Sequence, residues 1–169
     1  NNIVIAEDEE QIMKFGEIIK RLFEASAEPI RSAKVLTETL AAKAKLISSI
    51  LQTAMKNNET KEDKELHHKL NAFQKFLVHD MTEEQFVDFY AQTIVYGMFI
   101  ARIYDETPQN FSLLEAADLI PKTNPFLKKI FKTLALADPH KGIKWIVDDL
   151  VEIFKVTNME KVLRNYGKD

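Results

Sequence analysis

The chain contains no cysteine, and only four glycines and five prolines among 169 residues. Without cysteine there are no disulfide bonds, thiolate zinc sites or cysteine nucleophiles. The glycines are widely spaced, and the nearest two, Gly142 and Gly167, are 25 positions apart. Phosphate-binding loops and the G-x-S-x-G nucleophile elbow both need glycines within a few residues of each other, so both are excluded. Because a many-stranded sheet needs frequent turn-forming residues, this composition predicts a helical protein.

The chain also lacks a long apolar run and a strong net charge. Its longest apolar run, residues 94–101, is far shorter than the roughly 20 residues that a membrane-spanning helix needs. Its first acidic residues, at positions 7–10, give it the opposite charge pattern to a signal peptide. The formal net charge of −3 is not typical of a protein that binds nucleic acid over its whole surface. We therefore expect a cytoplasmic protein with no membrane partner.

Charge is nevertheless distributed unevenly. Residues 1–28 hold seven acidic against three basic residues, whereas residues 120–145 hold six lysines against one acidic residue. Each lysine that neutralises a DNA phosphate releases counterions and so strengthens binding at low salt. The six candidate contacts to a DNA backbone are Lys122, Lys128, Lys129, Lys132, Lys141 and Lys144. A solvated basic face is the alternative interpretation of the same cluster.

Apolar periodicity predicts a pair of helices in the first third of the chain. The first is expected over residues 8–24, and the second from Pro29 to about Met55. The apolar stripe of the first helix consists of Ile12, Phe15, Ile19 and Leu22. The second helix carries steps of four and three, typical of a heptad seam, at Leu40, Ala44, Ile47, Leu51 and Ala54. Such a seam is suited to pairing with another helix.

The remainder is expected to be an all-α bundle, giving about seven or eight helices in total. We divide the chain into an N-terminal helical pair (1–56), a polar loop (57–65) and a helical bundle (66–169), together one continuous domain of a longer protein. The spacing Thr82-Glu-Glu-Gln85 predicts a capping box that starts the most apolar helix, residues 83–104. Gly97 lies inside that helix, where glycine costs about 1 kcal/mol relative to alanine. A neighbouring helix that crosses closely at Gly97 would explain it.

Candidate chemistry in the sequence is sparse. Glu65-x-x-His68 has the spacing of a di-iron ligand pair, but that site needs a second such pair, and no other Glu-x-x-His occurs. A solvated helix start is therefore the stronger interpretation, and a ferritin-like metal oxidase is a distant alternative. No residue fits a catalytic, cofactor-binding or metal-binding role. We expect that these 169 residues carry no catalytic centre of their own.

Three segments resemble a helical block of known proteins. They are residues 84–102 (Glu-Gln-Phe-Val-Asp-Phe-Tyr-Ala-Gln-Thr-Ile-Val-Tyr-Gly-Met-Phe-Ile-Ala-Arg), 120–127 (Ile-Pro-Lys-Thr-Asn-Pro-Phe-Leu) and 143–150 (Ile-Lys-Trp-Ile-Val-Asp-Asp-Leu). This block is similar to one in adenine-N6 DNA methyltransferases of Type IIG and Type ISP restriction–modification systems. The resemblance covers residues 81–167, and its most specific part is residues 91–102.

The resemblance implies a parent protein that transfers a methyl group from S-adenosylmethionine to adenine N6, with Mg²⁺ serving any nuclease activity. In that family the helical block lies between a nuclease-like region and the methyltransferase domain. The cofactor loop and the Asn-Pro-Pro-Tyr motif do not occur in these 169 residues, so no catalytic residue is carried over. The expected role is that of a non-catalytic coupling domain. Its partners would be neighbouring domains of the same chain and, weakly, DNA.

A second hypothesis comes from a different functional class. A helical protein–protein interaction module would use the heptad seam of the second helix to bind a partner.

Overall fold

The computed structural model describes residues 30–137 and 139–164, and every regular element in these ranges is helical. The expected all-α fold is confirmed for this part of the chain. The first expected helix, residues 8–24, lies outside the described residues. The α-helices are α2 (Ala33–Asn57), α3 (Lys61–Phe76), α4 (Glu83–Ile103), α5 (Leu113–Leu119), α6 (Pro125–Phe131), α7 (Lys144–Val156) and α8 (Met159–Arg164). Shorter turns are η1 (Pro108–Asn110), the π-helical η2 (Lys132–Leu136) and η3 (Lys141–Ile143).

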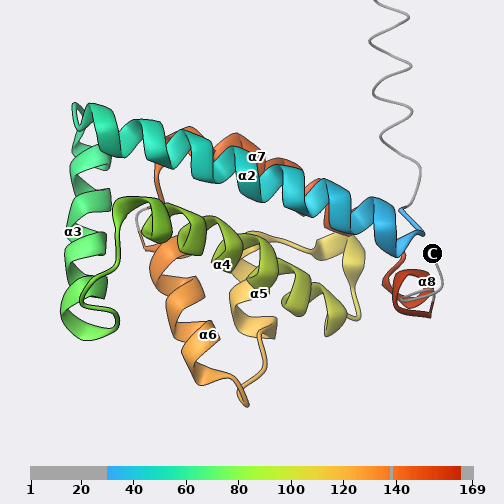
Figure 1. Ribbon diagram of the computed structural model, residues 1–169. Coiled ribbons are helices and arrows are strands. Elements are labelled where there is room, and N and C mark those ends of the chain that lie inside the picture. Colours follow the sequence, from blue (N-terminus) through green and yellow to red (C-terminus); the bar gives the residue numbers. More distant parts are fainter. Residues whose placement is uncertain (1–29, 138, 165–169) are drawn as a thin grey trace, which may run out of the picture.

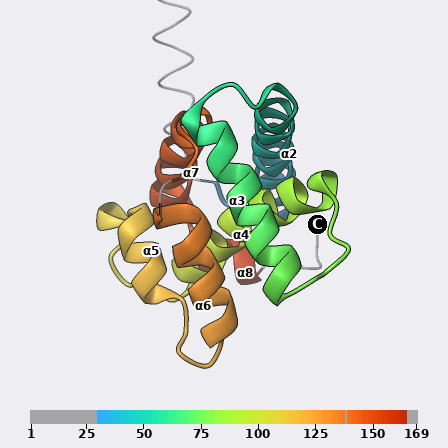
Figure 2. The same cartoon turned by 90° about the vertical axis from the view of Figure 1, so that its left-hand side faces the viewer.

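Helix α4 is the centre of the arrangement. It packs against α2 on one side and against α5, α6 and α7 on its other sides. Figure 1 shows α2 lying along α4, with α3 descending from the C-terminal end of α2 and α8 near its N-terminal end. Turning the molecule by 90° shows α2 and α7 above α4, α5 to its left and α6 below it (Figure 2). The most apolar helix thus has neighbours on several sides, with one face, at Asp88, Gln92 and Tyr96, left exposed.

The main core forms around α4 because its apolar residues cover nearly the whole helix circumference. Fully buried side chains include Phe86, Tyr90, Ile94 and Met98. A smaller cluster joins the N-terminal end of α2 to α8 and contains Ala33, Leu36, Met159 and Val162. The seam expected on α2 contributes to the main core at Ile47 and Leu51, both of which are completely buried.

Gly97 occurs where α6 meets α4. A Cβ atom placed on Gly97 would lie 2.2 Å from Cδ2 and 2.7 Å from Cε2 of the buried Phe131 ring. No side chain fits there, so glycine allows the end of α6 to approach α4 closely. The expectation of a close neighbour at this glycine is confirmed.

Capping residues determine where α4 and α2 begin. Thr82 accepts a hydrogen bond from the Gln85 amide, and Gln85 returns one to the Thr82 amide, which is the expected capping box. Helix α2 begins at Ala33, four residues later than the start expected at Pro29, because Ser32 is its N-cap. It ends at Asn57, followed by Asn58 in the left-handed conformation with φ of 50°. This end is two residues beyond the expected one.

The expected polar loop at 57–65 was wrong. Helix α3 begins at Lys61, so residues 61–65 are its first turn and the connection is only three residues long. The cause is a second capping box: Thr60 accepts from the Asp63 amide, and Asp63 accepts from the Thr60 amide. Acidic side chains in the first turn also favour the helix through its dipole. Residues 56–65 contain no apolar residue, so the apolar periodicity of the sequence did not indicate that a helix starts at Lys61.

The last long helix, α7, starts at Lys144, directly after the 3-10 turn η3. The residues before it are held by the side chain of His140, which accepts a hydrogen bond from the Gly142 amide.

Candidate functional site

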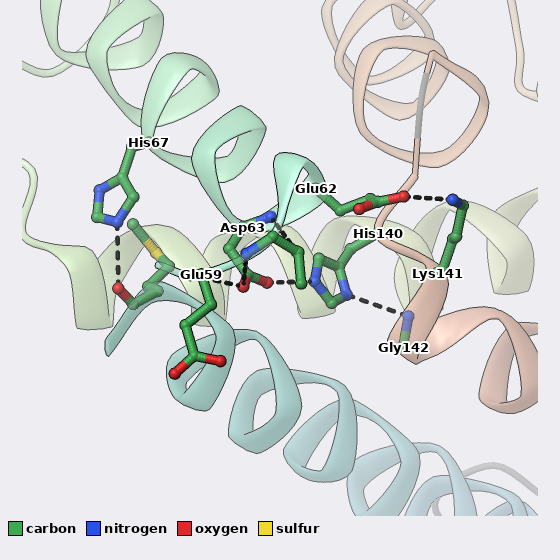
Figure 3. Close-up of polar contacts among 9 residues, drawn as sticks. Glu59, Glu62, Asp63, His67, His140, Lys141 and Gly142 are labelled. Carbon is green, nitrogen blue, oxygen red and sulfur yellow. Dashed lines mark hydrogen bonds and ion pairs between the residues drawn. The ribbon is translucent and has the colours of Figure 1, made fainter. Parts of the chain in front are cut away.

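A cluster of hydrogen bonds and ion pairs links the start of α3 to the segment before α7 (Figure 3). His140 Nε2 lies 2.9 Å from Asp63 Oδ1, and both side chains are about nine-tenths buried. These residues are 77 positions apart in the sequence. Asp63 Oδ2 also accepts hydrogen bonds from the amides of Glu59 (3.1 Å) and Thr60 (2.9 Å). The carboxylate is therefore surrounded by donors from two parts of the chain.

This environment determines the charge state of Asp63. The backbone amide of Thr60, followed by the His140 side chain, lowers the pKa of Asp63 from 3.8 to about 2. Both nitrogen atoms of the His140 ring take part in hydrogen bonds. Nδ1 accepts from the Gly142 amide at 3.1 Å, so Nε2 carries the proton donated to Asp63. A general base needs a ring nitrogen directed at a substrate. The Asp63–His140 pair instead ties two segments together.

Adjacent ionic contacts reinforce this tie. Lys141 pairs with Glu62, and this hydrogen bond is the main reason that the pKa of Glu62 is lowered. His67 Nε2 lies 3.1 Å from the carbonyl oxygen of Met55, which joins α3 to the end of α2. Together these contacts fix the position of α3.

The candidate metal ligands do not converge. His68 Nδ1 lies 3.3 Å from Glu65 Oε2, and the His68 side chain is 71% exposed. Among residues 30–137 and 139–164, no group of three or more histidine and carboxylate side chains is arranged to hold a metal ion. The Glu65–His68 pair is a surface contact within one helix.

Four of the six candidate DNA-contacting lysines lie around one groove of about 550 Å³. This lysine groove is lined by Lys122, Lys128, Lys129, Lys132, Pro125, Thr133 and Ala137. The lysines were evident as a cluster in the sequence, but their arrangement around one groove depends on α6 and η2 following one another without a break. The other two lysines do not line it. Lys141 pairs with Glu62, and Lys144 pairs with Asp148 at 2.5 Å.

Two of the groove lysines already have partners at the end of α5. Lys128 Nζ donates to the carbonyl oxygens of Asp118 (2.8 Å) and Ile120 (3.3 Å). Lys132 Nζ lies 3.2 Å from Asp118 Oδ1. Lys122 and Lys129 are exposed and form no ion pair with any residue in the described part of the chain. In the lysine groove, Lys128 and Lys132 are therefore held by partners at the end of α5, whereas Lys122 and Lys129 have no ion-pair partner among the described residues.

A second concave surface is apolar. It has a volume of about 670 Å³ and lies between α2 and α4, with α8 and Leu127 at its edges. We call it the apolar groove. It is lined by Ala33, Leu36, Thr37, Leu40, Ala41, Ala44, Phe89, Gln92, Thr93, Val95, Tyr96, Phe99, Leu127, Val162 and Leu163. Leu40 and Ala44 of the heptad seam line it, whereas Ile47 and Leu51 are enclosed by the chain's own core.

Sequence reasoning missed a third polar feature, the buried guanidinium of Arg102. Its Nε donates to the carbonyl oxygen of Phe154 at 2.9 Å, and Nη2 donates to that of Thr157 at 3.1 Å. Nη1 lies 3.8 Å from Asp105 Oδ2. Burial lowers the pKa of Arg102, and Asp105 partly offsets this effect. A charged residue within an apolar helical stripe was the only signal in the sequence.

Compared with protein-family models, with curated proteins and with solved structures, the chain matches none of them. No helix within residues 30–137 and 139–164 is both long and apolar enough to span a membrane.

Proposed function

We propose that this chain is a helical coupling domain of a larger DNA-modifying protein, of the adenine-N6 methyltransferase kind, and that it contacts the DNA backbone. In this proposal S-adenosylmethionine binds in another part of the parent protein, and the helical domain orients the nuclease and methyltransferase parts. The observation that carries the proposal is the lysine groove, where four cations surround one concave surface.

The chemistry of the groove suits phosphate rather than base recognition. Lysine is a compact point charge that attracts phosphate oxygens without reading base edges. Lys122 and Lys129 are exposed, so a phosphate would not have to displace an existing ion pair from them. The carboxylate of Asp118 moderates the positive charge at one edge. Binding should therefore be weak, independent of sequence and sensitive to salt.

The test is DNA binding by the double variant Lys122→Glu/Lys129→Glu. Fluorescence anisotropy with a labelled mixed-sequence duplex should show at least about tenfold weaker binding than wild type at low salt. The slope of log K against log salt should fall by about two, one for each lysine that contacts a phosphate. Lys61→Glu/Lys64→Glu is the matched control, because it changes net charge equally at exposed sites that line neither groove.

Two results would contradict this proposal. Equal weakening in both double variants would show that only net charge matters, and the absence of wild-type binding at low salt would remove the DNA contact. Titration calorimetry with S-adenosylmethionine should give no binding heat, because the proposal places the cofactor site in another part of the parent. Measurable binding to this chain would contradict that assignment.

The second candidate function is a helical protein–protein interaction module. The apolar groove favours it, because Tyr96 and Leu163 on its rim are 55% and 45% exposed. Ile47 and Leu51 lie in the core, so a substitution there would unfold the domain instead of separating a partner. Tyr96→Glu is the suitable variant, and sedimentation at several concentrations is the measurement. A concentration-dependent complex that Tyr96→Glu abolishes would favour this candidate.

A further inference from the structure

The apolar groove is long and continuous, and it lies beside the point where the chain enters α2. Its wall on α2 extends from Ala33 to Ala44, about 17 Å at 1.5 Å per residue. The amide of Asn158 donates to the Ile30 carbonyl oxygen at 3.0 Å. This bond holds the start of the described chain next to α8, at the same end of the groove as Ala33 and Val162.

The residues that precede this entry point have a matching apolar pattern. The sequence predicts an amphipathic helix over residues 8–24, with one apolar stripe formed by Ile12, Phe15, Ile19 and Leu22. From Ile12 to Leu22 this stripe would extend about 15 Å, close to the length of the α2 wall. The intervening residues 25–32 form a connection of eight residues, within the usual range for neighbouring antiparallel helices.

Charge is also complementary. Residues 1–28 hold seven acidic and three basic side chains, a net charge of −4. The exposed lysines Lys34 and Lys45 lie on α2, one turn from the groove residues Thr37 and Ala41 respectively. In an antiparallel arrangement the acidic run at positions 7–10 would lie near Lys45.

We propose that residues 8–24 form a helix that packs antiparallel to α2 in the apolar groove of the same molecule. Its stripe covers the exposed faces of Tyr96 and Leu163, and its acidic end lies beside Lys45. This inference does not rest on DNA binding. Occupation by this segment and binding of a separate protein at the groove exclude each other, so the following experiment decides between them.

The absence of native cysteine allows a specific cross-linking test in the full chain. The antiparallel register places Ile19 near Thr37, which lines the groove. Ile19→Cys/Thr37→Cys is treated with a short bismaleimide that spans the distance between packed helices, about 8–10 Å between axes. The matched control, Ile19→Cys/Val35→Cys, moves the second cysteine by two positions to the opposite face of α2, where Val35 is 49% exposed.

With residues 8–24 docked, the Ile19→Cys/Thr37→Cys pair cross-links within one molecule at least about tenfold faster than the Ile19→Cys/Val35→Cys pair. The reason is that docking raises the effective concentration of the cysteine at position 19 near the groove face of α2 only. In the background of Phe15→Glu this preference should be lost. Met13→Glu adds the same charge two positions away, on the opposite side of the predicted helix from the stripe, and should preserve the preference. Equal rates for the two cysteine pairs would overturn the proposal. Preferential formation of a covalent dimer would also overturn it, since a second copy would then fill the groove.

Discussion

Gly97→Ala provides a direct test of how closely α6 approaches α4. Alanine normally stabilises a helix interior relative to glycine by about 1 kcal/mol. At this position the new methyl group would lie 2.2 Å from one ring carbon of Phe131 and 2.7 Å from another. Carbon atoms in favourable contact are about 3.5–4.0 Å apart, so the ring would have to retreat by more than about 1 Å. Phe131 is completely buried, so its ring can retreat only towards other atoms of the core and not into solvent.

Overpacking of a filled core typically costs about 1–3 kcal/mol, and a clash of this size belongs at the upper end. After subtraction of the helix-propensity gain, we expect a net loss of about 2 kcal/mol in the free energy of unfolding. For a chain of this length that corresponds to a Tm decrease of roughly 4–8 °C. Urea titration followed by circular dichroism measures the first quantity, and a thermal melt measures the second.

A thermodynamic cycle with Phe131→Ala isolates the cause. Removal of the ring alone should cost about 3–5 kcal/mol. In that background Gly97→Ala should become neutral or stabilising, because the obstructing atoms are gone and only the propensity gain remains. The reasoning is refuted if Gly97→Ala stabilises the otherwise wild-type protein, or if its effect is the same with and without the ring.

Three further outcomes follow from the buried polar groups. Hydrogen bonds from the Thr60 amide and, second in size, from the His140 side chain lower the pKa of Asp63 to about 2. The ionised Asp63 carboxylate therefore stabilises the fold fully above about pH 4, and this stabilisation is lost as the pH falls through 2. The stability difference between wild type and Asp63→Asn should therefore shrink between pH 5 and pH 2 in urea titrations, and a constant difference would contradict this. Tyr90→Phe removes the donor to the Leu134 carbonyl oxygen, 2.5 Å away, and should cost about 1–3 kcal/mol by the same assay; no loss would mean that this buried carbonyl finds another donor. Arg102→Met removes the guanidinium donor from the carbonyl oxygens of Phe154 and Thr157, although the Phe154 oxygen still accepts from the Thr157 amide, and it leaves the buried Asp105 side chain without its ion-pair partner. It should destabilise by about 3–5 kcal/mol, and a Tm within 2 °C of wild type would contradict that role.

Much of the fold was predictable because its signals are local. The Thr82–Gln85 capping box and the apolar period of α4 lie within a few residues, and the structure has both where they were expected. The start of α3 has an equally local signal in Thr60 and Asp63, but the apolar pattern that usually accompanies such a cap begins only at Leu66. A cap without an adjacent apolar stripe was therefore assigned to a loop.

The polar sites were predictable only in part, because they depend on tertiary contacts. The six lysines were evident as a cluster in sequence, yet only the packing of α6 beside α5 separates the four that share a groove from the two that have other partners. Nothing near Asp63 in the sequence indicates that its partner is His140. Long-range pairs of this kind leave no periodic signal.

The contacts of Arg102 have a consequence for the length of α7. This helix ends at Val156 with neither glycine nor proline immediately after it, and a side chain of another helix binds the carbonyl groups at its end. One inserted residue in α7 would rotate everything after it by about 100° and shift it by 1.5 Å along the axis. The carbonyl groups would then point away from the guanidinium. Helix α4 therefore constrains the number of residues in α7, and insertions between Lys144 and Phe154 should be tolerated far less than in the exposed connection at residues 78–80.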